Sequence, residues 1–89
     1  MADVLLLKGP CDPRRVSMVV SVGATEVSVR PLPFDCHDVY RVVDRRVDGG
    51  TVTEATGEYR HTAGPRTQIQ AYRRAVARLG NRAFRVKRR

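Results

Sequence analysis

The stretch DVYRVVDRRVDGGTVTEATGEYR, residues 38–60, carries the strongest local structural signal in the chain. Valine and tyrosine side chains before the glycines alternate between two faces, which is typical of a strand. Gly49-Gly50 follows Asp48 and permits positive φ at either position, as a tight hairpin turn requires. The sequence therefore predicts a hairpin made of a strand over Asp38–Arg46 and a return strand over Thr51–Arg60.

Three more strands are predicted on the N-terminal side of this hairpin. The apolar run at Asp3–Lys8 has the length of a buried strand, and Gly9-Pro10 turns the chain after it. Arg15–Val22 and Thr25–Leu32 both alternate apolar and polar residues. Because only Gly23-Ala24 separates them, we expect these two strands to form a second hairpin. Prolines follow, and proline is confined to edges and strand ends.

A helix is predicted over Pro65–Leu79, because proline stands just inside its start and Gly80 just past its end. Its apolar residues recur at spacings of three and four and form one stripe: Ile69, Tyr72, Val76 and Leu79. The opposite side carries Gln70, Arg73, Arg74 and Arg78. After the helix, the alternation within Asn81–Arg89 allows a last short strand.

These elements predict one small α+β domain over residues 1–89, with a β-rich part at 1–60, a basic amphipathic helix at 65–80 and a basic tail at 81–89. The expected architecture is an antiparallel sheet of about five strands, built from two hairpins and an N-terminal strand, with the C-terminal helix covering one face. The expected core consists of apolar side chains from every element: Leu5, Leu7, Val16, Met18, Val20, Val27, Val29, Val42, Ile69, Tyr72, Val76, Leu79 and Phe84.

The charge of the chain is divided unevenly. Residues 60–89 hold ten of the 17 Lys and Arg residues and no Asp or Glu, whereas residues 1–59 hold seven cations against nine acids. Uncompensated positive charge repels itself, so a polyanionic partner is expected to neutralise it. The candidate binding residues are Arg66, Arg73, Arg74, Arg78, Arg82, Arg85, Lys87, Arg88 and Arg89.

Nucleic acid, either DNA or RNA, is the leading partner for this segment. Contacts mainly to phosphate are expected, since the sequence has no helix-turn-helix pair, zinc-finger spacing or RNA-recognition aromatic motif. Arg41, Arg45 and Arg46 could extend the basic surface across the sheet. The alternatives are an acidic protein surface in a virus particle, where the chain would be a structural component, and inhibition of a host protein. A solvated helix face that reflects solubility or codon bias alone also remains open. The sequence leaves the oligomeric state open.

Three short motifs resemble those of small proteins encoded by actinobacterial phages and prophages, and the resemblance covers about residues 3–60. The motifs are a turn after the first strand (LKGPCD, 7–12), a second turn (GATEV, 23–27) and a strand containing Tyr-Arg (VYRV, 39–42). This chain has Lys8 and Pro13 where those proteins have glycine. The resemblance implies a viral or prophage origin and transfers no functional residue.

Other chemistry has little support in the sequence. Cys11, Cys36, His37 and His61 include the ligand types that zinc takes, but adjacent Cys36 and His37 rarely ligate one tetrahedral ion. A Cys36/His61 nucleophilic pair or acid–base work by Glu54 and Glu58 would need a pocket that nothing in the sequence indicates. We therefore predict no enzyme and no cofactor.

The two cysteines form either one bridge or, as expected of a cytosolic protein, two free thiols. No run of residues has the length and apolarity of a membrane span or signal peptide, so we expect the protein in the host cytoplasm or in the virion.

Overall fold

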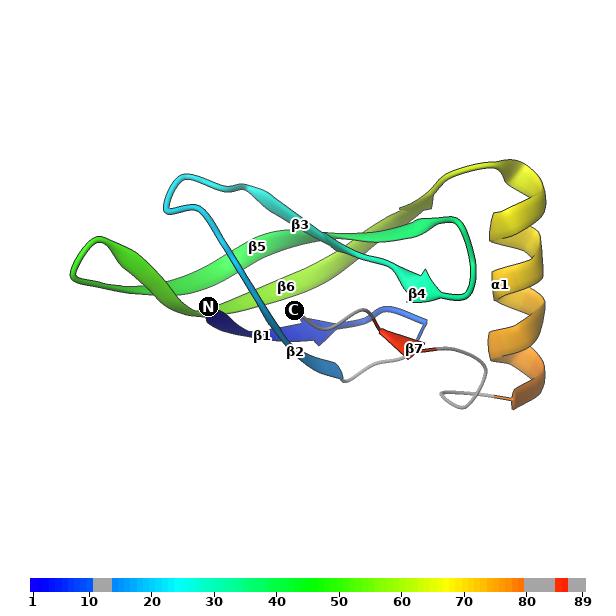
Figure 1. The fold of residues 1–89 in the computed structure, drawn as a ribbon, viewed down its shortest axis with the longest axis horizontal. Coiled ribbons are helices and arrows are strands. Elements are labelled where there is room, and N and C mark those ends of the chain that lie inside the picture. The colour runs from blue at the N-terminus through cyan, green and yellow to red at the C-terminus, as the bar shows by residue number, and fades with distance from the viewer. Residues whose placement is uncertain (11–13, 80–84, 87–89) are drawn as a thin grey trace.

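The structure is a computed structural model that describes residues 1–10, 14–79 and 85–86. Its elements, in chain order, are β1 (Ala2–Leu7), β2 (Arg14–Met18), β3 (Glu26–Val29), β4 (Pro31–Leu32), β5 (His37–Asp48), β6 (Thr51–Ala63), α1 (Arg66–Leu79) and β7 (Arg85–Val86). Figure 1 shows a long twisted sheet with α1 at one end. The α+β class predicted from the sequence is confirmed.

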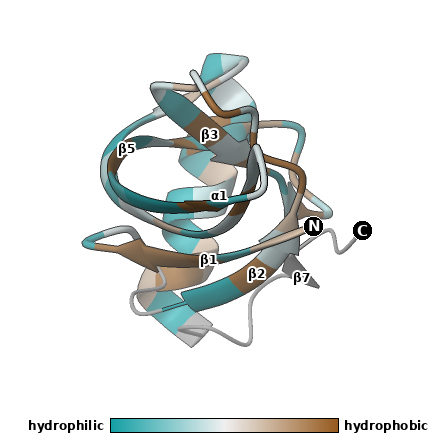
Figure 2. Ribbon diagram, turned by 90° about the vertical axis from the view of Figure 1, so that its left-hand side faces the viewer, coloured by the Kyte–Doolittle hydropathy of each residue, from teal (hydrophilic) through white to brown (hydrophobic). Residues whose placement is uncertain are grey.

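The central hairpin forms as predicted. β5 and β6 pair antiparallel over almost their whole length, from His37 opposite Ala63 to Asp48 opposite Thr51. Both turn glycines have positive φ, 61° at Gly49 and 80° at Gly50, which suits the right-handed twist of a two-residue hairpin. Three register shifts interrupt the ladder, and such irregularities bend a strand pair and increase its twist. Figure 2, viewed along the molecule, shows the strands curling around one interior.

The sheet is mixed and not wholly antiparallel as expected. Its five strands lie in the order β2-β1-β6-β5-β3, and β1 runs parallel to β6, with Val4 beside Ala55. A parallel neighbouring strand must come from a distant part of the chain, so no local turn in the sequence predicts the pairing. The antiparallel expectation came from local turns alone, which explains why it missed this pair.

The expected hairpin between the second and third strands is wrong. The reversal itself exists, because the Ala24 N–H donates to the Ser21 carbonyl at 3.0 Å. The strands on either side of it, however, pair elsewhere: β2 with β1 and β3 with β5. β2 and β3 are therefore the two opposite edges of the sheet, and the turn carries the chain from one edge to the other.

The core contains the expected kinds of residue, but in the first strand the other alternating set of side chains faces inward. Val4 and Leu6 are buried, whereas Leu5 and Leu7, which were expected inside, are only half-buried. A run of apolar residues does not reveal which set faces inward, and a shift of one residue exchanges the two faces. The predicted core residues that are buried are Val16, Val20, Val27, Val29 and Tyr72, and those that are half-buried are Met18, Val42, Ile69 and Val76. The side chains of Leu79 and Phe84 lie outside the described residues.

The helix begins one residue later than predicted, at Arg66, and ends at Leu79 as expected. Its position differs from the prediction: α1 does not cover a face of the sheet but stands across one end, where β5 begins and β6 ends (Figure 1). The molecule is accordingly elongated, with extents of 42 × 21 × 21 Å. Within the predicted C-terminal strand region, Arg85–Val86 forms β7, which pairs antiparallel with β4.

Candidate nucleic-acid interface

The exposed face of α1 is a row of arginines. Arg66, Arg73, Arg74 and Arg78 are all exposed. At 3.6 residues per turn these four side chains fall within an arc of roughly 140°, and exposed Thr67, Gln70 and Ala77 lie inside the same arc. We call these seven residues the arginine face. Four of the candidate binding residues predicted from sequence are thus brought together on one surface.

Among the residues that the structure describes, no ion pair neutralises the charge of the arginine face. Five ion pairs join described residues, and each involves a cation of the sheet or its loops: Lys8–Glu58, Arg14–Asp38, Arg30–Asp35, Arg46–Glu54 and Arg60–Glu26. None of the five includes a residue of α1. The first turn of the helix has no acidic residue and carries Arg66, although the positive end of the helix dipole favours anions there. The helix dipole therefore does not explain Arg66, whereas Arg78 lies in the last turn, where the dipole favours a cation.

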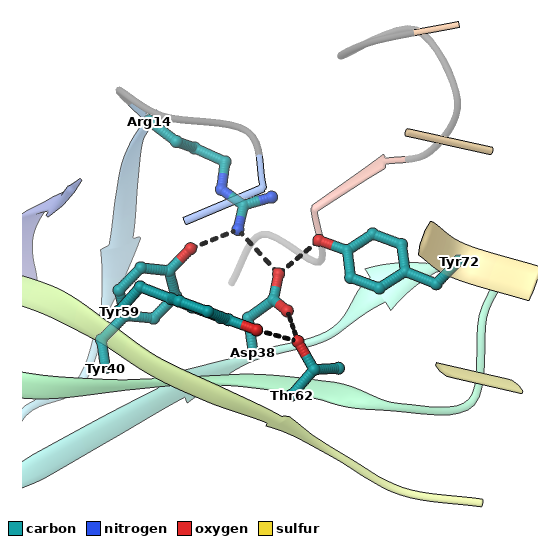
Figure 3. Close-up of polar contacts among 6 residues, drawn as sticks. All are labelled: Arg14, Asp38, Tyr40, Tyr59, Thr62 and Tyr72. Atoms are coloured by element: carbon teal, nitrogen blue, oxygen red, sulfur yellow. Dashed lines mark hydrogen bonds and ion pairs between the residues drawn. The ribbon is translucent and has the colours of Figure 1, made fainter. Parts of the chain in front are cut away.

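A buried carboxylate holds the opposite side of the helix (Figure 3). Asp38, near the start of β5, is 0% exposed. Its Oδ1 accepts a hydrogen bond from the Thr62 hydroxyl at 2.7 Å, and its Oδ2 accepts one from the Tyr72 hydroxyl of α1. The Arg14 guanidinium of β2 lies 3.4 Å from the same Oδ2 and neutralises the charge. One carboxylate thereby joins β2, β5, β6 and α1.

Two further tyrosines extend this cluster. The Tyr59 and Thr62 hydroxyl oxygens are 2.6 Å apart; because Thr62 gives its proton to Asp38, Tyr59 donates to Thr62. Arg14 Nη2 also donates to the Tyr40 hydroxyl at 3.1 Å, and the Tyr40 and Tyr59 rings meet edge to face, 5.7 Å between centroids. We call Arg14, Asp38, Tyr40, Tyr59, Thr62 and Tyr72 the Asp38 cluster. The hydrogen bonds of this cluster fix the position of Tyr72 and therefore that of α1.

The loop before β5 adds a second attachment for the helix. The Phe34 ring packs on the Tyr72 ring at 5.6 Å between centroids. The Asp35 backbone N–H donates to the Gln68 side-chain oxygen at 3.0 Å. Residues of α1 that face the sheet are thus held at Gln68 and Tyr72, which leaves the arginine face directed outward.

Two of the three sheet arginines named in the sequence prediction, Arg45 and Arg46, do not extend this face. Arg41 and Arg46 are exposed, and half-buried Arg45 donates to the Val22 carbonyl at 2.6 Å. Arg46 lies eight residues beyond Asp38 along β5, which corresponds to about 26 Å of extended chain. The two arginines nearest the turn therefore lie toward the far end of the molecule from α1.

The remaining candidate residues belong to the C-terminal segment. Arg85 lies in β7, where the structure describes the backbone. Arg82, Lys87, Arg88 and Arg89 lie outside the described residues, as does Cys11 of the considered zinc set.

The geometry of the described residues gives no support to the zinc site or to the catalytic pairs considered from the sequence. Cys36 is buried, and burial, followed by the nearby Asp38 and Asp35 carboxylates, raises the pKa of its thiol, which disfavours a thiolate nucleophile. His37 and His61 are exposed. Glu54 and Glu58 each form an ion pair. Among the residues that the structure describes, no three His, Cys, Asp or Glu side chains are grouped as a metal site.

Sequence reasoning missed the Asp38 cluster, although one signal was available. Asp38 has the same parity along β5 as Tyr40 and Val42, so it points to the same side as an aromatic residue and an aliphatic one. A carboxylate on an inward-facing side needs donors, and Thr62, Tyr72 and Arg14 supply them.

Within the described part of the chain, no helix has the length and apolarity needed to cross a membrane. No protein-family model, no curated protein and no solved structure matches this sequence.

Proposed function

We propose that the protein binds nucleic acid through the arginine face of α1 and that it acts by binding alone, without catalysis. The observation that carries the proposal is the placement of four exposed arginines, none with an acidic partner among the described residues, on the outward side of a helix. The inner side of that helix is held by a buried hydrogen bond at Tyr72 and an exposed one at Gln68. A face of this kind repels itself until an anion covers it.

Arginine suits phosphate in particular. Its planar guanidinium presents several donors in a fixed fork that matches phosphate oxygens, and its pKa keeps it charged. The first and last of the four arginines, Arg66 and Arg78, are twelve residue steps apart, about 18 Å along the helix axis, so the four can meet several phosphates of one strand or of two. Because the helix is already formed, binding costs little backbone conformational entropy.

The proposal predicts a measurable salt dependence. If each arginine neutralises one phosphate of duplex DNA, the logarithm of the affinity falls with the logarithm of salt concentration with a slope of about −3.6. Fluorescence anisotropy with a labelled random-sequence duplex and a labelled RNA hairpin, from low to physiological salt, measures this slope.

The decisive comparison uses two triple variants of equal charge. Replacing Arg73, Arg74 and Arg78 with Gln removes three positive charges from the arginine face. The control replaces Arg15, Arg41 and Arg46, three exposed arginines of the sheet, with Gln. Both variants lower the formal net charge from +8 to +5. We expect the helix variant to reduce the magnitude of the salt slope by about 2.7 and the control to leave the slope nearly unchanged.

Two results would reject the proposal. One is the absence of binding at about 50 mM salt, where electrostatic binding is strong. The other is equal weakening by the two triple variants, which would mean that net charge and not the arginine face attracts the probe. In the first case an acidic protein surface, such as a neighbouring subunit of a virus particle, becomes the partner to test.

A further inference from the structure

We propose that the nucleic acid is B-form duplex DNA and that α1 lies in its major groove, with Gln70 at the base edges. This inference rests on the function proposed above. It adds the class of nucleic acid, the groove and a residue that reads sequence.

The position of α1 makes groove entry sterically open. The helix stands at one end of an elongated molecule, and in Figure 1 no other described element lies beyond its outer side. An α-helix with its side chains is about 10–12 Å across, which matches the width of about 12 Å of the B-DNA major groove. The major groove of A-form RNA is deep and narrow and does not admit a helix. A protruding helix therefore discriminates between the two duplexes.

The arginine face has an internal order that fits a groove with two walls. With 100° per residue, Gln70 and Ala77 lie along the middle of the face. Arg66 and Arg73 lie on one side of this middle line, about 40° and 60° from Gln70. Arg74 and Arg78 lie on the other side, at about 40° and 80°. Each flank thus presents two cations, as the two phosphate backbones bordering a groove would require.

The middle line carries the residues that would face the bases. Glutamine pairs with adenine through N7 and the N6 amino group in the major groove, and alanine makes apolar contact with the thymine methyl group. Gln70 and Ala77 are both exposed, and they are seven residues apart, about 10.5 Å along the helix axis. Base contact by Gln70, with Ala77 near the methyl groups, gives a preference for sites containing A·T pairs between flanking phosphate contacts.

Groove placement is tested by duplex type and by chemical protection. The full chain is titrated against a mixed-sequence DNA duplex and an RNA duplex of the same sequence at one salt concentration, and the DNA complex is treated with dimethyl sulfate. Guanine N7 lies in the major groove and adenine N3 in the minor groove. We expect binding to RNA at least tenfold weaker, with guanine N7 protected and adenine N3 still methylated.

A duplex that the wild-type protein prefers is first selected from a randomised library. Base reading is then tested on this duplex with two single variants. Gln70→Ala should reduce the preference for the selected duplex over a random one by about 5- to 150-fold, the range for one bidentate base contact, and leave the salt slope unchanged. Arg74→Gln should weaken binding to both duplexes equally and reduce the magnitude of the slope by about 0.9.

The outcomes separate this inference from the proposed function. Equal affinity for the RNA and DNA duplexes, or protection of adenine N3 alone, overturns the major-groove placement while leaving nucleic-acid binding intact. A Gln70→Ala variant that keeps the full sequence preference overturns the base-reading role. Absence of binding to either duplex overturns the proposed function itself.

Discussion

Replacing Tyr72 with Phe removes one hydroxyl from the Asp38 cluster and should destabilise the whole protein. Tyr72 is 0% exposed, and its hydroxyl donates to the buried Asp38 carboxylate. A hydrogen bond to a charged group contributes about 1.5–3 kcal/mol, and the ring remains in place against Phe34, so no large cavity adds to the loss. For a domain of this length each kcal/mol corresponds to about 4–8 °C, so the melting temperature should fall by at least about 6 °C.

Tyr59→Phe is the matched control, because its hydroxyl donates to the neutral Thr62 hydroxyl and not to the carboxylate. A neutral hydrogen bond contributes about 0.5–1.5 kcal/mol, so this variant should lose less. Urea unfolding followed by circular dichroism gives both free energies. Two-state curves with Tyr72→Phe as stable as the wild type, or more stable than Tyr59→Phe, would refute the reasoning that Asp38 holds the helix.

Three other substitutions test neighbouring features, each by its urea midpoint. Asp38→Asn should cost about 3–5 kcal/mol because it leaves the largely buried Arg14 cation without its carboxylate, and a loss below 1 kcal/mol would contradict this pairing. Gly64→Ala should cost about 1–3 kcal/mol, since φ there is 145° and a Cβ would lie 3.0 Å from Cys36; unchanged stability would argue against this backbone conformation. The third test uses Cys11→Ser as background. Because folding raises the pKa of the Cys36 thiol, the unfolded chain loses the thiol proton at a lower pH than the folded protein does. Stability should therefore fall as pH rises through 9.0. Adding Cys36→Ala should reduce that fall between about pH 8 and pH 10, and an identical pH dependence would show that other groups cause it.

Features that depend on neighbouring residues were predictable from the sequence, and those that depend on distant partners were not. Gly49-Gly50 and the Pro65-to-Gly80 spacing are local signals, and the hairpin and α1 form where they indicate. The reversal at Gly23-Ala24 is equally local, but a turn does not specify which strands pair. β2 instead joins β1, and β3 joins β5, because Val16 of β2 and Val27 and Val29 of β3 are buried in a shared core.

The candidate site divides in the same way. Exposure of the four arginines on α1 followed from helical periodicity, since the apolar stripe fixes which side faces outward. The Asp38 cluster joins residues 24 and 34 positions away from Asp38, and no spacing in the sequence brings a threonine of β6 and a tyrosine of α1 to one carboxylate. Only the curl of the sheet and the placement of the helix across its end do so.

Burying the charges of the Asp38 cluster costs free energy, which suggests that the cluster contributes something other than stability. Desolvating Asp38 and Arg14 is expensive, and replacing such a buried pair by apolar residues of similar volume is often neutral or stabilising. An apolar end of the sheet, however, would let an amphipathic helix settle in several orientations, whereas a carboxylate with directed donors accepts Tyr72 in one. A variant combining Arg14→Met, Asp38→Leu, Thr62→Val and Tyr72→Phe separates the two roles. If the cluster serves orientation, the free energy of unfolding of this variant should lie within about 2 kcal/mol of the wild-type value. The amide hydrogens of α1 should nevertheless exchange faster, and the variant should bind duplex DNA more weakly. Undiminished DNA affinity in a stably folded variant would mean that the arginine face needs no fixed orientation.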